Sequence, residues 1–241
     1  MEQLSGDVLT LGVLWYLAFL FSTTCHEASH ALAAKIGGDP TAAHGGQVTL
    51  NPIPHVSREP FGMVLIPLIS YVLGGGMIGW ASAPFDPYWQ QRYPRRAAWM
   101  SLAGPAANFA LVLISAIGIH AGIAGGVFER PEYVNFQHIT QVANPEAAGT
   151  LAKFAAAFLS VMFFENVLLG TFNLLPLPPL DGSTGVGVLM SEQTALRFYS
   201  FIHQPMFQMM GIMIAWIVFN RLFDPIFIFS IDLLYPGSHY R

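Results

Sequence analysis

The chain has 241 residues, of which 54% are hydrophobic and only 10% are charged, and its mean hydropathy is +0.50. Soluble globular domains carry roughly 25% charged residues, so this composition excludes an ordinary soluble domain and favours a surface that faces lipid. The net charge of -4 and the scattering of the ten Lys and Arg residues exclude a nucleic-acid-binding protein. The length predicts a single membrane-embedded domain over residues 1–241, with a core over about 8–182 and a C-terminal helical part over about 190–241.

The first hydrophobic segment, from about Val8 to Ala34, is predicted to be a membrane-spanning helix. At ~1.5 Å per residue it measures roughly 40 Å, which is enough to cross the hydrocarbon core with some tilt. The residues before it include Glu2 and Asp7 but no Lys or Arg, unlike the start of a secretory signal. We therefore expect this segment to be retained.

Residues 45–80 are predicted to lie at the membrane, and partly within it, without crossing it. The stretch 45–55 contains glycines and prolines and is predicted to be a short strand or hairpin near the interface. Residues 61–80 are apolar, but Pro67 and the glycines at 74–76 interrupt them. This pattern favours a re-entrant hairpin, which is tolerated at membrane depth where protein or a wet cavity satisfies its backbone.

Two continuous apolar runs, 97–124 and 151–175, are predicted to span the membrane. The C-terminal region is expected to hold one more span up to about residue 219. A break at 220–225 and a shorter apolar piece should follow it.

The arginines at positions 92, 95 and 96 set the expected orientation, because loops rich in positive charge stay in the cytoplasm. The acidic loop 125–149 then lies outside. With 61–80 as a hairpin, 97–124 is the single crossing between the first helix and the 151–175 helix, so those two helices end at the same face. We expect a multi-pass protein of the cell membrane with its site near the cytoplasmic face.

The end of the first apolar segment reads Cys25-His26-Glu27-Ala28-Ser29-His30, which contains an H-E-x-x-H motif. Residues four apart lie on one face of a helix, so His26 and His30 can bind one metal ion through their imidazoles. Glu27 lies beside them, where its carboxylate can take a proton from a water on the metal. The motif alone also occurs by chance, so further residues are needed.

A third ligand is expected, because zinc in hydrolases usually takes three protein ligands and keeps one position for water. The extended motif of soluble enzymes is absent, since Ala33 and Ile36 occupy its glycine and third histidine positions. Asp181 is the better candidate, because it is a lone acid following the 151–175 run. Charged groups at membrane depth tend to be paired, metal-bound or functional.

These motifs together resemble those of the site-2 protease family of intramembrane zinc metalloproteases. The resemblance rests on H-E-x-x-H in a spanning helix, Gly104-Pro105-x-x-Asn108 in a middle one and Asn173-x-x-Pro176-x-Pro178-x-x-Asp181-Gly182 downstream. Thr49-Leu-Asn-Pro and Gly79-Trp80-Ala81 also resemble elements of prokaryotic members. The similarity spans about residues 23–182, and no PDZ or CBS module fits into the remaining length.

The resemblance implies an all-α polytopic membrane protein with a three-helix metalloprotease core. The re-entrant hairpin, a short interfacial β element and an additional C-terminal helix complete the expected fold. It also implies one zinc ion held by His26, His30 and Asp181, with Glu27 as general base.

Two asparagines are assigned to substrate binding through the same resemblance. Asn173 matches a position that holds the substrate backbone or the developing oxyanion. Asn108 would support site geometry, or would simply bond across helices. Ser29 and Ser183 depart from the family pattern, which favours glycine at both positions, but neither departure removes a ligand or the base.

The implied function is hydrolysis of a peptide bond in or near the transmembrane segment of another protein within the bilayer. An unwound substrate segment would pair with an edge supplied by Gln47–Leu50 or by the 61–80 hairpin. The alternative is a non-proteolytic zinc-binding membrane protein of the same fold, such as a metal carrier or a scaffold. The presence of Glu27 favours the protease, since binding zinc needs the ligands but not the base.

The sequence leaves two possible roles open for each of three residues near the motifs. His44 and His55 either guard or extend the site, or they are solvated loop residues, which is the commoner role. Cys25 either touches the metal or packs as a small buried thiol.

Overall fold

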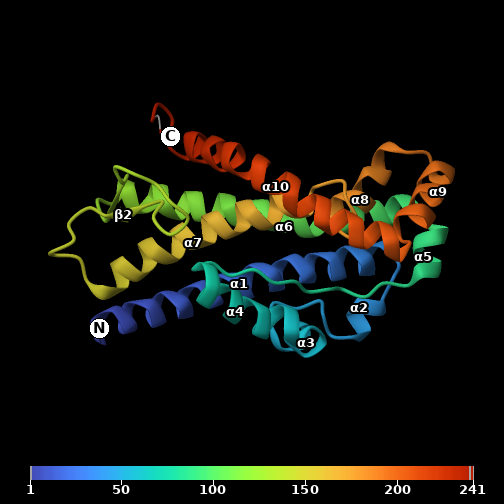
Figure 1. Cartoon of the computed structure of the whole chain (residues 1–241), viewed down its shortest axis with the longest axis horizontal. Coiled ribbons are helices and arrows are strands. Elements are labelled where there is room, and N and C mark those ends of the chain that lie inside the picture. Colours follow the sequence, from blue (N-terminus) through green and yellow to red (C-terminus); the bar gives the residue numbers. More distant parts are fainter. Residues whose placement is uncertain (1, 239, 241) are drawn as a thin grey trace.

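The computed structural model describes residues 2–238 and Tyr240, with side chains from Val8 onward. It is an all-α polytopic membrane protein (Figure 1). Four helices in the described part are long and apolar enough to cross a membrane: α1 (Glu2–Gly37), α6 (Pro94–Ala124), α7 (Thr150–Asn173) and α10 (Pro205–Leu234). The shorter elements are α2 (Thr41–His44), α3 (Ile53–Arg58), η1 (Phe61–Leu65), α4 (Ile66–Gly74), α5 (Pro87–Arg92), β1 (Phe128–Glu129), β2 (Gln141–Val142), α8 (Asp181–Gly185), η2 (Val186–Leu189) and α9 (Glu192–Ile202).

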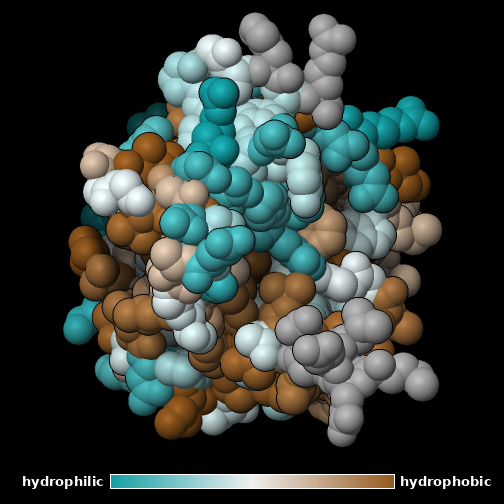
Figure 2. Space-filling view, turned by 90° about the vertical axis from the view of Figure 1, so that its left-hand side faces the viewer, coloured by the Kyte–Doolittle hydropathy of each residue, from teal (hydrophilic) through white to brown (hydrophobic). Residues whose placement is uncertain are grey.

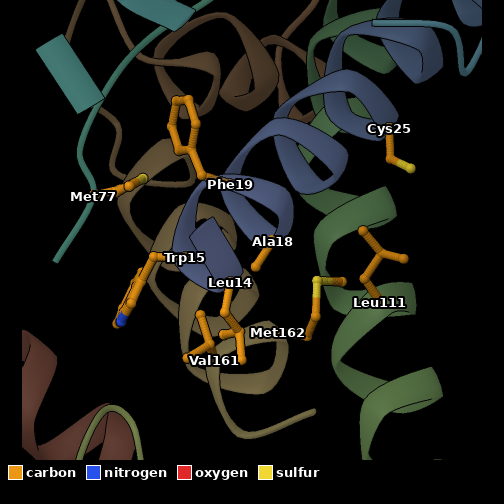
Figure 3. Close-up of a cluster of buried hydrophobic side chains, with 9 residues drawn as sticks. All are labelled: Leu14, Trp15, Ala18, Phe19, Cys25, Met77, Leu111, Val161 and Met162. Atoms are coloured by element: carbon orange, nitrogen blue, oxygen red, sulfur yellow. The ribbon is translucent and has the colours of Figure 1, made fainter. Parts of the chain in front are cut away.

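The core is formed by α1, α6 and α7, each of which packs against the other two. Figure 3 shows how the side chains of α1 divide between neighbours: Leu14 and Ala18 point towards Val161 and Met162 of α7. Trp15 and Phe19 point to the other side of α1, where Met77 of the segment after α4 meets them. The three-helix core expected from the sequence is therefore present, and the segment after α4 packs on its outside.

Residues 61–86 reverse direction and form two legs, as the hairpin prediction requires. The first leg consists of η1 and α4, and it ends at Gly75, whose positive φ of 73° favours glycine. The second leg is extended and runs back along α1 to α5 (Figure 1). The legs are joined by a hydrogen bond from Trp80 N to Gly62 O of 3.2 Å. They touch so closely that a Cβ on Gly62 would collide with the carbonyl oxygen of Trp80.

The turn of this hairpin lies near Val8, the first residue of the apolar span of α1. The hydroxyl of Tyr71 donates to Val8 O at 2.7 Å, and Gln137 Nε2 donates to Gly75 O at 3.2 Å. The base of the hairpin is fixed at the opposite end of α1, where Asp39 Oδ2 accepts from Asp86 N at 2.8 Å. The hairpin is therefore held near its turn by Val8 and Gln137, and at its base by Asp39, which follows α1.

The prediction of a short β element over 45–55 was wrong. The described chain has no strand there and instead forms α2, a turn and α3. Asn51 Oδ1 accepts from Ile53 N at 3.0 Å, and the prolines at 52 and 54 lie where α3 begins. Proline cannot donate to a strand ladder but is well suited to the first turn of a helix, which explains the outcome.

The β pairing in the described chain lies instead in the loop 125–149. Strands β1 and β2 are antiparallel, with Phe128 opposite Val142 and Glu129 opposite Gln141. Figure 2 views the end of the bundle that carries this loop and both termini. Hydrophilic side chains gather over its upper centre, with hydrophobic side chains at the sides and below. The polar surface at this end therefore lies to one side, next to apolar surface.

The break expected at 220–225 is also absent, because α10 continues through Pro225 to Leu234. The ring of Phe164 on α7 packs against Phe223 and Phe227, with ring centroids 5.5 and 5.3 Å away. These two contacts lie on either side of the proline, so packing holds the helix together where one backbone donor is missing.

Candidate metal centre

The H-E-x-x-H residues lie on α1, and Asp181 begins α8 after the loop 174–180. His26, Glu27 and His30 are all buried, with exposed fractions of 5–6%. Asp181 Oδ2 lies 3.0 Å from Nε2 of His26 and 3.2 Å from Nε2 of His30. The two Nε2 atoms are 3.0 Å apart. The structure thus brings together the three side chains predicted as ligands, although His26 and Asp181 are 155 positions apart in the chain.

The other ring nitrogen of each histidine is held by α6. His30 Nδ1 lies 2.8 Å from the carbonyl oxygen of Met100. His26 Nδ1 lies 2.6 Å from Oδ1 of Asn108, whose Nδ2 donates to Asn166 Oδ1 at 2.8 Å. Both partners of the imidazoles are acceptors, so both Nδ1 atoms carry the hydrogen and both Nε2 atoms present a lone pair.

Three acceptor atoms therefore converge on one point: Nε2 of His26, Nε2 of His30 and Oδ2 of Asp181. Neutral imidazole nitrogens and a carboxylate repel one another at this separation unless a cation lies between them. A tetrahedral zinc ion with bonds of about 2.0–2.1 Å holds its ligand atoms about 3.3 Å apart, close to the spacing found. The residues present fit a zinc ion.

Gly104 of the Gly-Pro-x-x-Asn motif explains why α6 can approach the histidines so closely. A Cβ at this position would lie 2.5 Å from Nε2 of His26 and would also collide with His30. The backbone of α6 therefore forms one wall of the site, and a side chain at 104 would displace the imidazoles.

The loop 174–180 aims Asp181 at the two histidines. Ser101 Oγ on α6 donates to the carbonyl oxygen of Asp181. Gly182 packs against the backbone of Leu174, where a Cβ would collide with the carbonyl oxygen. The Asp-Gly pair in the motif thus combines a ligand with a close backbone contact.

Two cavities meet at the site. The first, of about 550 Å³, is lined by residues that include His30, Met100 and His203, and burial lowers the pKa of His203. The second, of about 720 Å³, lies among α1, the hairpin, α7 and α10, and its lining is mostly apolar. Glu27 and Asp181 line both cavities, so the predicted base faces the space on either side.

The two asparagines predicted to bind substrate occupy different places. Asn173 lines the second cavity, and its Nδ2 donates to Leu169 O at 3.1 Å. Asn108 is fully buried and bonded to His26 and Asn166. Its position favours support of His26 over contact with a substrate.

The sequence analysis missed Asn166, Ser82 and the true place of His55. Asn166 extends the chain of hydrogen bonds from His26 to Ser22 Oγ on α1, at 2.8 Å. Asn166 could have been found from the sequence as a polar residue within an apolar run. Ser82 lines both cavities beside Glu27, and His55 is fully buried, whereas His44 is exposed.

A model of Peptidase family M50 matches residues 14–218, which includes every predicted ligand and the base. The chain belongs to peptidase family M50. The resemblance to site-2 proteases inferred from the motifs is thereby confirmed, and this M50 chain is a peptidase with several membrane-spanning helices.

Two relatives of the M50 chain carry names that agree with the family. It is 30% identical over 195 residues to "Putative zinc metalloprotease YwhC" of Bacillus subtilis, covering 77% of this chain and 75% of that protein. It is 28% identical over 170 residues to "Putative zinc metalloprotease Rip2" of Mycolicibacterium smegmatis, covering 70% of this chain but only 54% of that protein. No solved structure matches the chain.

Proposed function

We propose that the chain is an intramembrane zinc metalloprotease in which His26, His30 and Asp181 hold one zinc ion. The observation that carries this proposal is the convergence of three acceptor atoms within 3.2 Å of one another, with both Nδ1 hydrogens held elsewhere. When bound, zinc supplies Lewis acidity that polarises a carbonyl and lowers the pKa of a water. The names of the two relatives support zinc as the metal.

Glu27 is the general base in this proposal. It lines both cavities and lies within 4.8 Å of the ligand nitrogens, so a water beside the ion is within its reach. Its carboxylate accepts the proton of the attacking water and then passes it to the leaving amine. Asn173, in the wall of the second cavity, orients the substrate backbone or the developing oxyanion.

The second cavity binds the substrate, which is an apolar segment of another membrane protein. Its walls include Phe172 and Trp216 on one side and residues 78–82 of the extended hairpin leg on the other. An unwound segment can pair with this extended leg by strand addition. The leg suits this role better than Gln47–Leu50, which forms a turn with Gln47 buried.

The whole described chain then acts as a single protease domain with its site near the cytoplasmic face of the cell membrane. The arginines at 92, 95 and 96 lie in or beside α5 and the start of α6, at the same end of the bundle as α2, α8 and α9 (Figure 1). By the positive-inside rule this end is cytoplasmic.

The test compares wild type with Glu27→Gln in liposomes, measuring zinc content and cleavage of a model transmembrane substrate. Both proteins should bind one zinc ion per chain, while the variant should cleave about 10²–10⁴-fold more slowly. Glu165→Gln is the matched control, because Glu165 is an equally buried carboxylate on α7 outside the ligand set. Wild type that binds zinc but cleaves none of a varied substrate panel would support a carrier or scaffold instead. Wild type without zinc would overturn the ligand assignment.

A further inference from the structure

The first cavity is lined by polar side chains that have no hydrogen-bond partner among the described residues. Gln90 on α5 lines this cavity and is only 7% exposed, yet its side-chain amide is bonded to no other described residue. Thr184 on α8 and Gln208 on α10 line the same cavity, and their side chains also lack a partner in the described part of the chain. Buried polar groups are normally hydrogen-bonded, so three free groups from three helices indicate a polar ligand.

The helix that carries Gln90 is fixed to the end of α1. Trp89, the residue before Gln90, is buried, and its Nε1 donates to the carbonyl oxygen of Gly37 at 3.0 Å. At the start of α5, Asp86 Oδ1 accepts from Tyr88 N at 2.9 Å and caps the helix. The amide of Gln90 is therefore presented to the cavity from a backbone that is held in place.

The size and position of the first cavity suit a stretch of peptide chain. Its volume of about 550 Å³ lies in the range of ligand pockets, roughly 300–1,000 Å³, and far exceeds the ~30 Å³ that one water occupies. Glu27 and Asp181 line both this cavity and the mostly apolar second one. A chain that fills both cavities therefore passes the candidate metal centre.

The charges around the first cavity favour an uncharged ligand. The described residues that line it include no Lys or Arg, and its carboxyl groups are those of Glu27 and Asp181, which the proposed function already uses. His203 also lines it, and burial lowers the pKa of this histidine, which keeps the ring neutral at pH 7. A strongly acidic or basic stretch would find no counter-charge here.

A side-chain amide offers both a donor and an acceptor, so it can pair with the C=O and the N–H of a peptide backbone. Resting on the function proposed above, we propose that the first cavity binds an extended, uncharged polar stretch that flanks the apolar segment of the substrate, with Gln90 bonded to its backbone. The apolar segment fills the second cavity. The peptide bond at the junction of the two stretches then lies at the candidate metal centre.

The competing explanation is that the first cavity only admits water, and two model peptides separate the two roles. Both carry the same apolar segment. The long peptide continues into a stretch of Ser, Asn and Gln, whereas the short one stops at the last apolar residue with a neutral cap. Each is made with the stretch at the amino or at the carboxyl end. Their Kd values are measured with Glu27→Gln protein, which should bind them without cleavage, and kcat and KM are measured with an intact Glu27.

The long peptide should bind about tenfold more tightly than the short one in one of the two chain directions. Gln90→Met should remove most of this difference, the usual effect of losing one or two neutral hydrogen bonds, and should leave the Kd of the short peptide within about twofold. Gln91→Met is the matched control, because Gln91 is the next residue on α5 and is exposed. It should change neither Kd. Zinc content and melting temperature should be equal in the two variants.

Thr184→Val is a second variant on another helix, in case Gln90→Met does not fold. It removes the hydroxyl group at nearly constant size, and it should also weaken binding of the long peptide but not of the short one. In the cleavage assay both variants should raise KM for the long peptide alone.

Equal Kd values for the long and the short peptide in both chain directions would overturn the proposal. So would an equal loss for both peptides in Gln90→Met, or a fall in kcat for both at unchanged Kd, which is the result expected of a water path. Failure of the proposed function is distinguishable. In that case neither peptide is cleaved, while the long one still binds more tightly through Gln90.

Discussion

Two buried glutamates on neighbouring spanning helices contrast sharply in their surroundings. Glu27 on α1 lies among His26, His30 and Asp181, where a cation fits. Glu165 on α7 is 1% exposed, and neither of its carboxyl oxygens has a hydrogen-bond partner among the described residues. The next residue, Asn166, turns the other way and joins the hydrogen bonds that lead to His26.

The difference teaches that burial of an acid in a spanning helix does not by itself mark a site. Around Glu27, the proposed base, lie the three proposed ligands, and Asn108 bonds to one of them. Near Glu165 the carboxyl group costs free energy, because its desolvation is not offset by hydrogen bonds. Substitutions beside Glu27 should therefore change zinc binding and activity, whereas substitutions away from the candidate metal centre should change stability at most.

The largest contrast is expected from two glycines of α6. Gly104→Ala puts a methyl group against both imidazoles, so zinc content and cleavage should both fall to near zero. Gly118→Ala, in the other half of the same helix, meets only the flexible end of Leu159 at 3.2 Å. It should keep zinc and activity, and the higher helix propensity of alanine, ~1 kcal/mol, offsets the contact. Retention of zinc in Gly104→Ala would refute the geometry of the centre.

A smaller contrast is expected from two buried polar side chains. Asn108→Ala removes the partner of His26 Nδ1, so zinc affinity or activity should fall by about 10–100-fold. Ser160→Ala removes the acceptor for the N–H groups of Ile139 and Thr140, which costs roughly 1–3 kcal/mol of stability but leaves zinc affinity unchanged. Zinc titration and thermal unfolding of both variants distinguish the effects. Equal zinc affinity in Asn108→Ala and wild type would contradict the role given to Asn108.

The smallest effect on activity is expected at Glu165. Glu165→Met replaces the unpartnered acid by an apolar side chain of similar size, so stability should rise by roughly 1–3 kcal/mol. Cleavage should stay within about twofold of wild type. Thermal unfolding and the cleavage assay measure both. A loss of cleavage at unchanged zinc content would mean that Glu165 belongs to the site after all.

The candidate ligands were predictable because their signal is local or stands out from its surroundings. The four-residue spacing of His26 and His30 is a property of any helix, and Asp181 is a lone acid after an apolar run. The hairpin was predictable from Pro67 and the glycines at 74–76. Whether these side chains meet depends on how helices far apart in the sequence pack, which the family resemblance supplied and local patterns did not.

The parts that failed depend on tertiary contacts or on competing local rules. His55 follows a proline-rich stretch that looks solvated, yet it is fully buried. The same stretch was predicted to be a strand, but its prolines lie where α3 begins. Pro225 suggested a helix end, but packing on Phe164 carries α10 through it. Glu165 was overlooked in the apolar run 151–175, and its lack of hydrogen-bond partners among the described residues is visible only in the fold.

The chain of hydrogen bonds from His26 through Asn108 and Asn166 to Ser22 has a thermodynamic consequence. It connects α1, α6 and α7 to the candidate ligands, so the arrangement that binds the ion is also the arrangement in which the three helices are packed. Binding of zinc is then linked to folding, and a ligand at 100 times its Kd stabilises the state it binds by about 2.7 kcal/mol. If the proposed ligands hold zinc, removing it with a chelator should lower the melting temperature of this bundle.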